Sequence, residues 1–169
     1  MMQLGLDEIH AANKALSVAG QWVEAANQRL YFVVPLEIDE ATLEGLVLRG
    51  RAVKDRPDEE VMFQLEFPQP SRRDRGIDRI DWRPLHTHNN LGRGPDELRF
   101  MPQVNSHHHA FDLNWLAAEA RMLTSNLPLA RPIEPDLKSF DDLLAFIKKS
   151  FRINDIGQIP PPPWEGLLL

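Results

Sequence analysis

The chain contains no cysteine, which excludes disulfide bonds, thiolate metal ligands and cysteine nucleophiles. Long hydrophobic runs are also missing, because no apolar stretch approaches the roughly 20 residues that a membrane-spanning helix needs. The first residues lack a basic segment followed by an apolar run, so we expect no secretory signal peptide. Together these absences predict a cytoplasmic protein that makes no contact with membranes.

An excess of positive charge is absent too, since 25 acidic residues against 19 lysines and arginines give a net charge of −6. Such a chain has no general attraction to nucleic-acid backbones. One local exception is a group of five arginines, which we interpret as a solvated hairpin loop rather than a nucleic-acid surface. They are Arg72, Arg73, Arg75, Arg79 and Arg83. Three catalytic motifs are missing as well: a Gly-rich phosphate loop, a Gly-x-Ser-x-Gly turn and a His-Glu-x-x-His pair.

The length of 169 residues and the hydrophobic content of 43% predict a single domain, residues 1–169, that needs no cross-links to fold. We predict an α+β fold: an antiparallel β-meander of about four to six strands, with an N-terminal and a C-terminal helix packed on it. The strand-like segments are residues 30–38, 43–53, 61–67 and 79–83, with 98–102 as a further candidate. Pro35 predicts an edge position or a bulge in the first. The alternation in 61–67 predicts a strand with one buried face.

Helical spacing of apolar residues predicts a first helix over residues 7–19, ending at Gly20. Residues 21–26 either continue this helix or form the hairpin partner of the next strand. A second helix is expected over residues 114–123, with Asp112 or Asn114 as its cap.

The last predicted helix begins at Ser139 and continues an apolar stripe from Phe140 to Phe151. Residues 157–169 form a proline-rich tail. Trp164 is expected to dock this tail on the body of the protein. A partner-binding role for the tail is the alternative.

The histidines are the clearest indication of a site, because five of six lie between positions 86 and 109. The neutral ring is the commonest metal ligand, and its charge changes near neutral pH. Alternate residues of a strand face the same side, so His86 and His88 should project together, and so should His107 and His109. A hairpin between the pairs would bring all four rings together, with His108 facing away. We expect His10 to be an ordinary helix residue.

Three interpretations of this cluster are open. First, His86, His88, His107 and His109, with Asp112 as a further ligand, would suit a divalent transition metal such as zinc. The His-x-His start of the cupin motif is present, but the glutamate that should follow it is not.

Second, a histidine from one pair could act as the base in RNA cleavage and a histidine from the other pair as the acid. Arg83 or Arg99 would then stabilise the phosphorane. Third, the histidines could form a purely structural polar network with nearby asparagines. These are Asn89, Asn90, Asn105 and Asn114.

The second half of the chain also suggests a family. A short meander, an Asn/His-rich turn, a second histidine element and the segment from Phe140 to Lys149 follow one another. This order resembles the small bacterial toxin proteins of the TumE type, over about Arg79 to Arg152. The resemblance implies a toxin–antitoxin or phage-defence setting, with RNA as the target and a helix-turn-helix antitoxin as the partner.

The leading hypothesis from the sequence is therefore a toxin-like or phage-defence protein whose histidine-lined site acts on RNA phosphodiesters. The catalytic set would be His86, His88, His107, His109 and Arg83. The alternative is a non-enzymatic binding module in which the same four histidines hold a metal or shape a surface for a protein partner.

Overall fold

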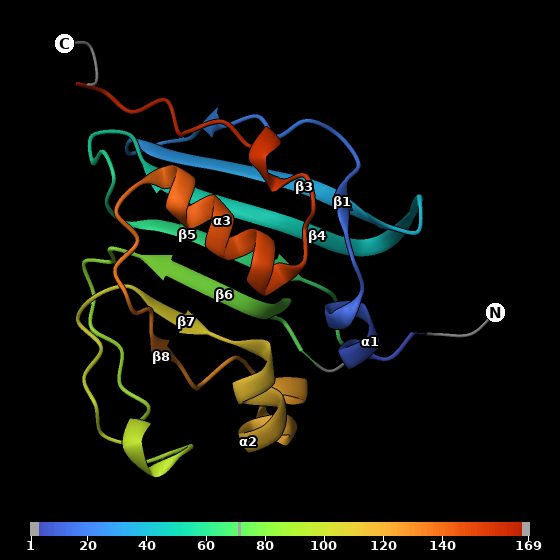
Figure 1. Cartoon of the computed structure of the whole chain (residues 1–169), viewed down its shortest axis with the longest axis vertical. Helices are drawn as coiled ribbons and strands as arrows, with labels where there is room; N and C mark the ends of the chain where they lie inside the picture. The colour runs from blue at the N-terminus through green and yellow to red at the C-terminus, as the bar shows by residue number, and fades with distance from the viewer. Residues whose placement is uncertain (1–3, 71, 167–169) are drawn as a thin grey trace.

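The computed structural model describes residues 4–70 and 72–166, and its centre is one antiparallel sheet (Figure 1). The strands run in the order β1-β3-β4-β5-β6-β7-β8, and β2 also pairs with β3. Their bounds are β1 Ala15–Leu16, β2 Val23–Glu24, β3 Arg29–Ile38, β4 Ala41–Val53, β5 Val61–Glu66, β6 Gly76–Trp82, β7 His107–His109 and β8 Arg131–Pro132. The predicted α+β fold is confirmed. The sheet has eight strands rather than four to six because β1, β2 and β8 are pairings of only two residues.

Three helices and two short 3-10 turns accompany the sheet: α1 Leu6–Ala11, α2 Phe111–Thr124, α3 Phe140–Phe151, η1 Asp96–Leu98 and η2 Ile156–Gln158. α3 lies across one face of the sheet (Figure 1). It begins where the sequence predicts, since Ser139 is the N-cap and its side chain accepts a hydrogen bond from the Asp142 backbone N–H at 3.1 Å. None of the helices in the described part of the chain has the length and apolar character that a bilayer crossing requires.

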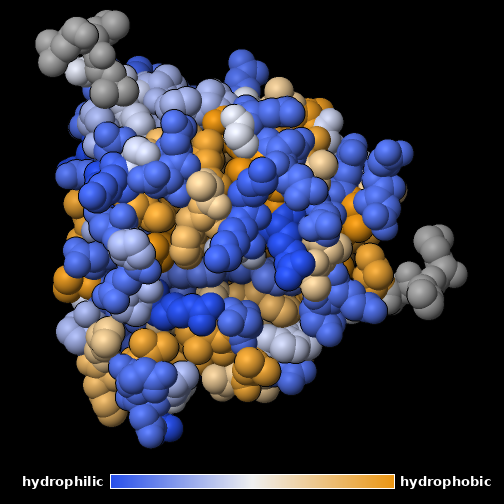
Figure 2. All heavy atoms as spheres, viewed as in Figure 1, coloured by the Kyte–Doolittle hydropathy of each residue, from blue (hydrophilic) through white to orange (hydrophobic). Residues whose placement is uncertain are grey.

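Strand alternation divides the sheet into two different faces. The face beneath α3, here called the α3 face, is apolar, and its fully buried side chains include Phe32, Leu48, Phe63 and Ile80. Seen from this side, polar residues cover much of the surface, and apolar side chains appear between them (Figure 2). The opposite face, here called the polar face, carries two cross-strand rows. One is Tyr31, Arg51, Met62, Asp81 and His107, and the other is Val33, Arg49, Gln64, Arg79 and His109.

The N-terminal helix is much shorter than predicted. α1 ends at Ala11, and Ala15–Leu16 pairs with β3 instead of continuing the helix to Gly20. The buried ammonium group of Lys14 donates to the carbonyls of His10, Ala12 and Phe151, at 2.8, 2.9 and 2.9 Å. These tertiary contacts outweigh the local helix pattern. Residues 21–26 supply β2, so they are a hairpin partner of β3 rather than helix.

Two strand predictions also need correction. β5 is buried on both faces rather than one. On the polar face Met62, which lines a cavity with His86 of the segment after β6, is 8% exposed, and Glu66, which is bonded to Arg49 and Gln64, is 4% exposed. Residues 98–102 form no strand. The turn η1 ends at Leu98, residues 99–100 continue as a turn, and Phe100 is 76% exposed, so this segment does not return to the sheet.

The arginine group and the second helix differ from expectation in their details. Arg72 is buried and donates to the carbonyls of Ser125 and Gly76, so the five arginines do not form one solvated loop. α2 is capped by Ala110, not by Asp112 or Asn114. Asn114 is buried and holds the chain at Leu129 through bonds of its amide to the backbone, at 2.9 and 3.0 Å.

Two other predictions agree with the structure. Pro35 adjoins a bulge in the pairing of β3 with β4, which accommodates its missing N–H. The tail docks through Trp164, which is 8% exposed and meets the ring of Phe140 edge-on at 6.1 Å. Residues 167–169 of the predicted tail lie outside the described residues.

Candidate metal centre

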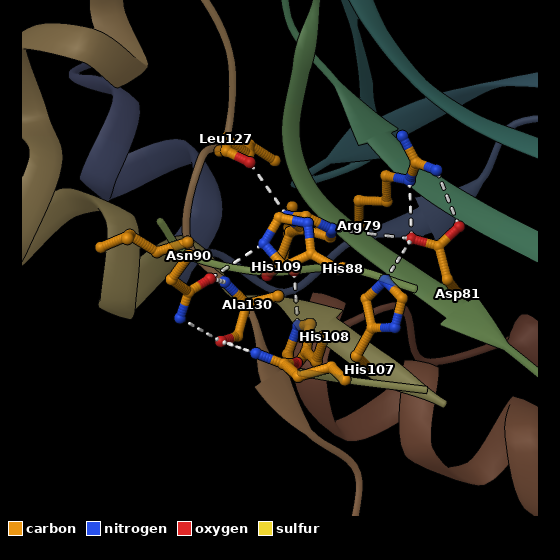
Figure 3. A network of polar contacts seen from close by, with 12 residues as sticks. Arg79, Asp81, His88, Asn90, His107, His108, His109, Leu127 and Ala130 are labelled. Carbon is orange, nitrogen blue, oxygen red and sulfur yellow. Dashed lines mark hydrogen bonds and ion pairs between the residues drawn. The ribbon is translucent and has the colours of Figure 1, made fainter. Parts of the chain in front are cut away.

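The structure brings together the four histidines that alternation places on common faces. β7 pairs with β6, so His107 and His109 lie on the polar face beside Asp81 and Arg79. The segment after β6 crosses over this face and is fixed by a β-bridge between His88 and Gln103. The ring centroids of His107 lie 5.7, 5.6 and 5.3 Å from those of His86, His88 and His109, and His88 lies 4.6 Å from His109. Figure 3 shows three of these rings gathered near Asp81.

A carboxylate that the sequence interpretation missed lies at this cluster. Asp81 follows Ile80 on β6 and is only 3% exposed. Its Oδ2 is 3.5 Å from His107 Nε2 and 3.8 Å from His109 Nε2. Arg79 donates to both carboxylate oxygens, at 2.8 Å each. A carboxylate has about four lone-pair positions, so Asp81 keeps acceptor capacity toward the histidines after binding Arg79.

Backbone carbonyls fix the tautomers of the two buried histidines. His107 Nδ1 lies 3.0 Å from the Asn105 carbonyl, and His109 Nδ1 lies 2.9 Å from the Leu127 carbonyl. A carbonyl only accepts, so each Nδ1 carries the proton and each neutral ring has its lone pair on Nε2. Metal-ligating histidines commonly donate their second ring N–H in this way.

The ring of His88 is held by a different group. Asn90 Oδ1 accepts from the Ala130 backbone N–H at 2.9 Å, which identifies this atom as oxygen rather than nitrogen. His88 Nε2, also 2.9 Å away, must therefore donate to it. The lone pair of a neutral His88 is consequently on Nδ1. Asn90 and Asn105 thus form part of the polar network that the sequence suggested, and this network orients the rings toward one another.

Burial keeps the two inner rings uncharged. Desolvation is the main cause that lowers the pKa of His109 to about 3, and the Asp81 carboxylate only partly opposes it. Burial also places the pKa of His107 below its ordinary value, against the opposing effects of the Asn105 carbonyl and Asp81. Neutral imidazole is the form that binds metals.

The spacing of the ligand atoms suits a small divalent cation. Single ligand atoms of Asp81, His86 and His107 lie within 4.8 Å of one another. In a tetrahedral zinc site with bonds of about 2.0–2.1 Å, neighbouring ligand atoms lie about 3.4 Å apart. The separation of 3.5 Å between His107 Nε2 and Asp81 Oδ2 already has this value. His86 is exposed and lies on the covering segment, so it is the ligand with the freedom to approach.

Other residues named from the sequence lie elsewhere. The Arg83 guanidinium lies over the Trp82 ring at 4.9 Å and points toward Asp136 and the Leu137 carbonyl. Arg99 donates to the Gly94 carbonyl on the outside of its loop. Asp112 pairs with Arg131 at 2.8 Å and lines a separate cavity with His10 and His108. The arginine at the cluster is Arg79, and the acid is Asp81. The strand alternation that grouped His107 with His109 also groups Arg79 with Asp81, so the sequence contained this signal.

No protein-family model matches this chain, and neither the curated proteins nor the solved structures contain a significant match. The resemblance to TumE-type toxins therefore stays a prediction.

Proposed function

We propose that the protein binds one divalent transition metal ion, such as zinc, and that this centre is its functional site. Asp81, His86 and His107 would supply the ligands, with His109 beside them. One observation carries the proposal: His107 Nε2 is buried, has no hydrogen-bond partner among the described residues, and faces Asp81 Oδ2 at 3.5 Å. An unpaired buried polar atom costs about 1–3 kcal/mol. A cation between the two atoms would remove this cost.

A proton on the same nitrogen is the competing explanation. It would charge the His107 ring, because Nδ1 already carries a proton for the Asn105 carbonyl. Burial disfavours the charged ring and lowers the pKa of His107. A metal ion needs the neutral ring, so the surroundings of His107 favour the metal.

The ligand set supports a reactive rather than a purely structural centre. Three protein ligands leave one position of a tetrahedral zinc ion for water or substrate, as in catalytic zinc sites. RNA cleavage, the toxin-like or phage-defence role and the antitoxin partner stay predictions from the sequence. In its two-histidine form, RNA cleavage needs a protonated ring as the general acid. Burial of His107 and His109 disfavours the acid role for these two rings, so His86 or His88 would have to supply it, whereas a metal-assisted reaction at this centre is compatible with neutral rings.

Metal content tests the proposal. The protein is purified without an affinity tag, stripped with a chelator, incubated with zinc, dialysed and assayed for bound metal. We expect one equivalent, and loss of it in His107→Ala. His10→Gln is the matched control, because it removes an imidazole on the α3 face yet keeps a donor for Asp78. Wild-type protein that stays metal-free after incubation with zinc, nickel or iron(II) would overturn the proposal, and so would full retention of metal in a folded His107→Ala variant.

The identity of the third ligand has its own test. His86→Ala should weaken zinc binding by more than about 10- to 100-fold, which is the usual effect of removing a group that only supports a ligand. His88→Ala should weaken it less, because the Nε2 of His88 is already committed to Asn90. An equal or larger loss in the His88 variant would contradict the ligand set proposed here.

A further inference from the structure

The polar face continues from the metal centre into a cavity of about 500 Å³. This volume lies in the range of small-molecule sites. Asp81 and His86 line the cavity at the end near the centre. Four arginines from three strands line it as well: Arg29 on β3, Arg49 and Arg51 on β4, and Arg79 on β6.

Two of these arginines are free to bind a ligand. Arg49 is paired with Glu66 at 2.7 Å, and Arg79 is paired with Asp81. Arg29 and Arg51 are exposed and form no ion pair within residues 4–70 and 72–166. The acid Glu60 also lines the cavity, but it faces Arg56 at 3.7 Å. The cavity is therefore locally positive in a chain whose net charge is −6.

An aromatic ring accompanies the free guanidinium groups. Tyr31 lies directly opposite Arg51 in the pairing of β3 with β4, on the same face, and is 40% exposed. Tyr31 and Arg29 are two positions apart on β3, so they share that face as well. Guanidinium groups bind phosphate oxygens as a fork, and exposed aromatic rings stack on nucleobases.

We propose that this cavity binds a nucleotide, with its phosphate on Arg51 and Arg29 and its base on Tyr31. The ribose that joins them would face along the cavity toward Asp81 and His86. Met62 alone separates Arg51 from Asp81 in their cross-strand row, so their backbones are about 10 Å apart. This distance leaves room for the sugar between the phosphate anchor and the metal centre. A nucleotide combines the charged group that Arg51 and Arg29 would bind with the flat ring that would stack on Tyr31.

This inference rests on the proposed function in one respect, since it makes the metal centre the second end of the same site. The contacts of the phosphate and the base do not need the metal. Binding is therefore measured separately on metal-free and zinc-loaded protein. Nucleotide binding without any metal binding would leave the inference standing and overturn the metal centre, and metal binding without nucleotide binding would do the reverse.

Calorimetric titration of the full chain at low salt uses adenosine 5′-monophosphate, ribose 5-phosphate and adenosine as probes. We expect adenosine 5′-monophosphate to bind most tightly and its affinity to fall as salt is added. Arg51→Gln should weaken both phosphorylated probes by about 10- to 100-fold. Tyr31→Ala should weaken adenosine 5′-monophosphate by about 5- to 100-fold and leave ribose 5-phosphate unchanged. Arg73→Gln, which removes an exposed arginine outside the cavity, is the control and should change neither.

The same titrations can overturn the proposal. Adenosine binding as tightly as its monophosphate would refute recognition of the phosphate. An Arg51→Gln variant indistinguishable from wild type would refute the assigned anchor, and ribose 5-phosphate binding as tightly as the nucleotide would refute the stacked base. A dinucleoside monophosphate that binds more tightly than adenosine 5′-monophosphate would identify a nucleic-acid strand, rather than a free nucleotide, as the source of the ligand.

Discussion

Asp78 Oδ1 lies 2.6 Å from His108 Nε2 on the α3 face of the sheet, and Asp78 Oδ2 lies 2.8 Å from His10 Nε2. Three residues further along β6, Asp81 faces His107 on the polar face without a hydrogen bond. The same pair of strands therefore carries two kinds of aspartate–histidine contact. The contact at Asp78 is complete and joins α1, β6 and β7, whereas the contact at Asp81 leaves a histidine nitrogen available to a ligand.

Replacement of Asp78 by asparagine should destabilise the protein by about 3–5 kcal/mol, the usual effect of breaking a buried pair. Burial alone raises the pKa of Asp78, but His108 and His10 outweigh burial and hold it below 3.8. The stabilisation is therefore present above pH 3.8 and is lost as the pH falls through the folded-state pKa. Urea unfolding should show the difference between wild type and Asp78→Asn shrinking below pH 3.8. Asp39→Asn, at an exposed turn position, is the control and should have little effect on the free energy of unfolding. A difference that does not change with acid would contradict this account.

Removal of the Asn90 side-chain amide should also lower the free energy of unfolding. Asn90 donates to the carbonyls of Leu98 and Ala130 at 3.2 and 2.9 Å, and it accepts from the Ala130 N–H and from His88. Asn90→Ala leaves these groups unpaired, and we expect a loss of about 2–4 kcal/mol in the free energy of unfolding. The matched change Asn89→Ala removes one exposed bond, to the Leu91 N–H, and should cost less than about 1 kcal/mol. Equal losses in the two variants would show that Asn90 does not hold this loop.

Because Lys14 is buried, we predict that the protein becomes more stable as the pH rises into the alkaline range. Burial, assisted by Arg152 and partly opposed by Asp78, lowers the pKa of Lys14 to about 8 from an ordinary value of 10.5. Between pH 8 and pH 10.5 the unfolded chain binds more protons at this residue than the folded chain, so stability rises with pH. The cost of charged Lys14 is fully present below pH 8 and is relieved by pH 10.5, with a gain of at most about 3 kcal/mol.

Urea unfolding across this pH range measures the effect. Lys14→Met should lack the rise and should be less stable than wild type at pH 8, because three backbone carbonyls lose their donor. Lys138→Met, at an exposed position, should keep the wild-type pH dependence. Parallel curves for wild type and Lys14→Met would refute the altered titration of this lysine.

Some of the site could be predicted because it depends on local geometry. Period-two alternation places His107 and His109 on one face and His108 on the other, whatever the rest of the fold is. The same rule applied to β6 would have added Asp81. Arg83 and Asp112 could not be excluded in this way, because Arg83 lies just beyond the end of β6 and Asp112 lies in the first turn of α2, where strand alternation does not fix the direction of a side chain. Their partners, Asp136 and Arg131, are distant in the sequence or on another element.

By itself, the sequence determined the α+β class, the long strands, the start of the last helix at Ser139 and the division of the histidines between two faces. Each of these follows from composition or from contacts within a few residues. The tertiary structure alone decided that α1 stops at Ala11, because the burial of Lys14 against Phe151 depends on a segment more than a hundred positions away. It also decided that the two histidine pairs converge on Asp81, since that requires the pairing of β7 with β6 and the bridge from His88 to Gln103. Local patterns fix which way a side chain points, but only the pairing of distant segments determines what it meets there.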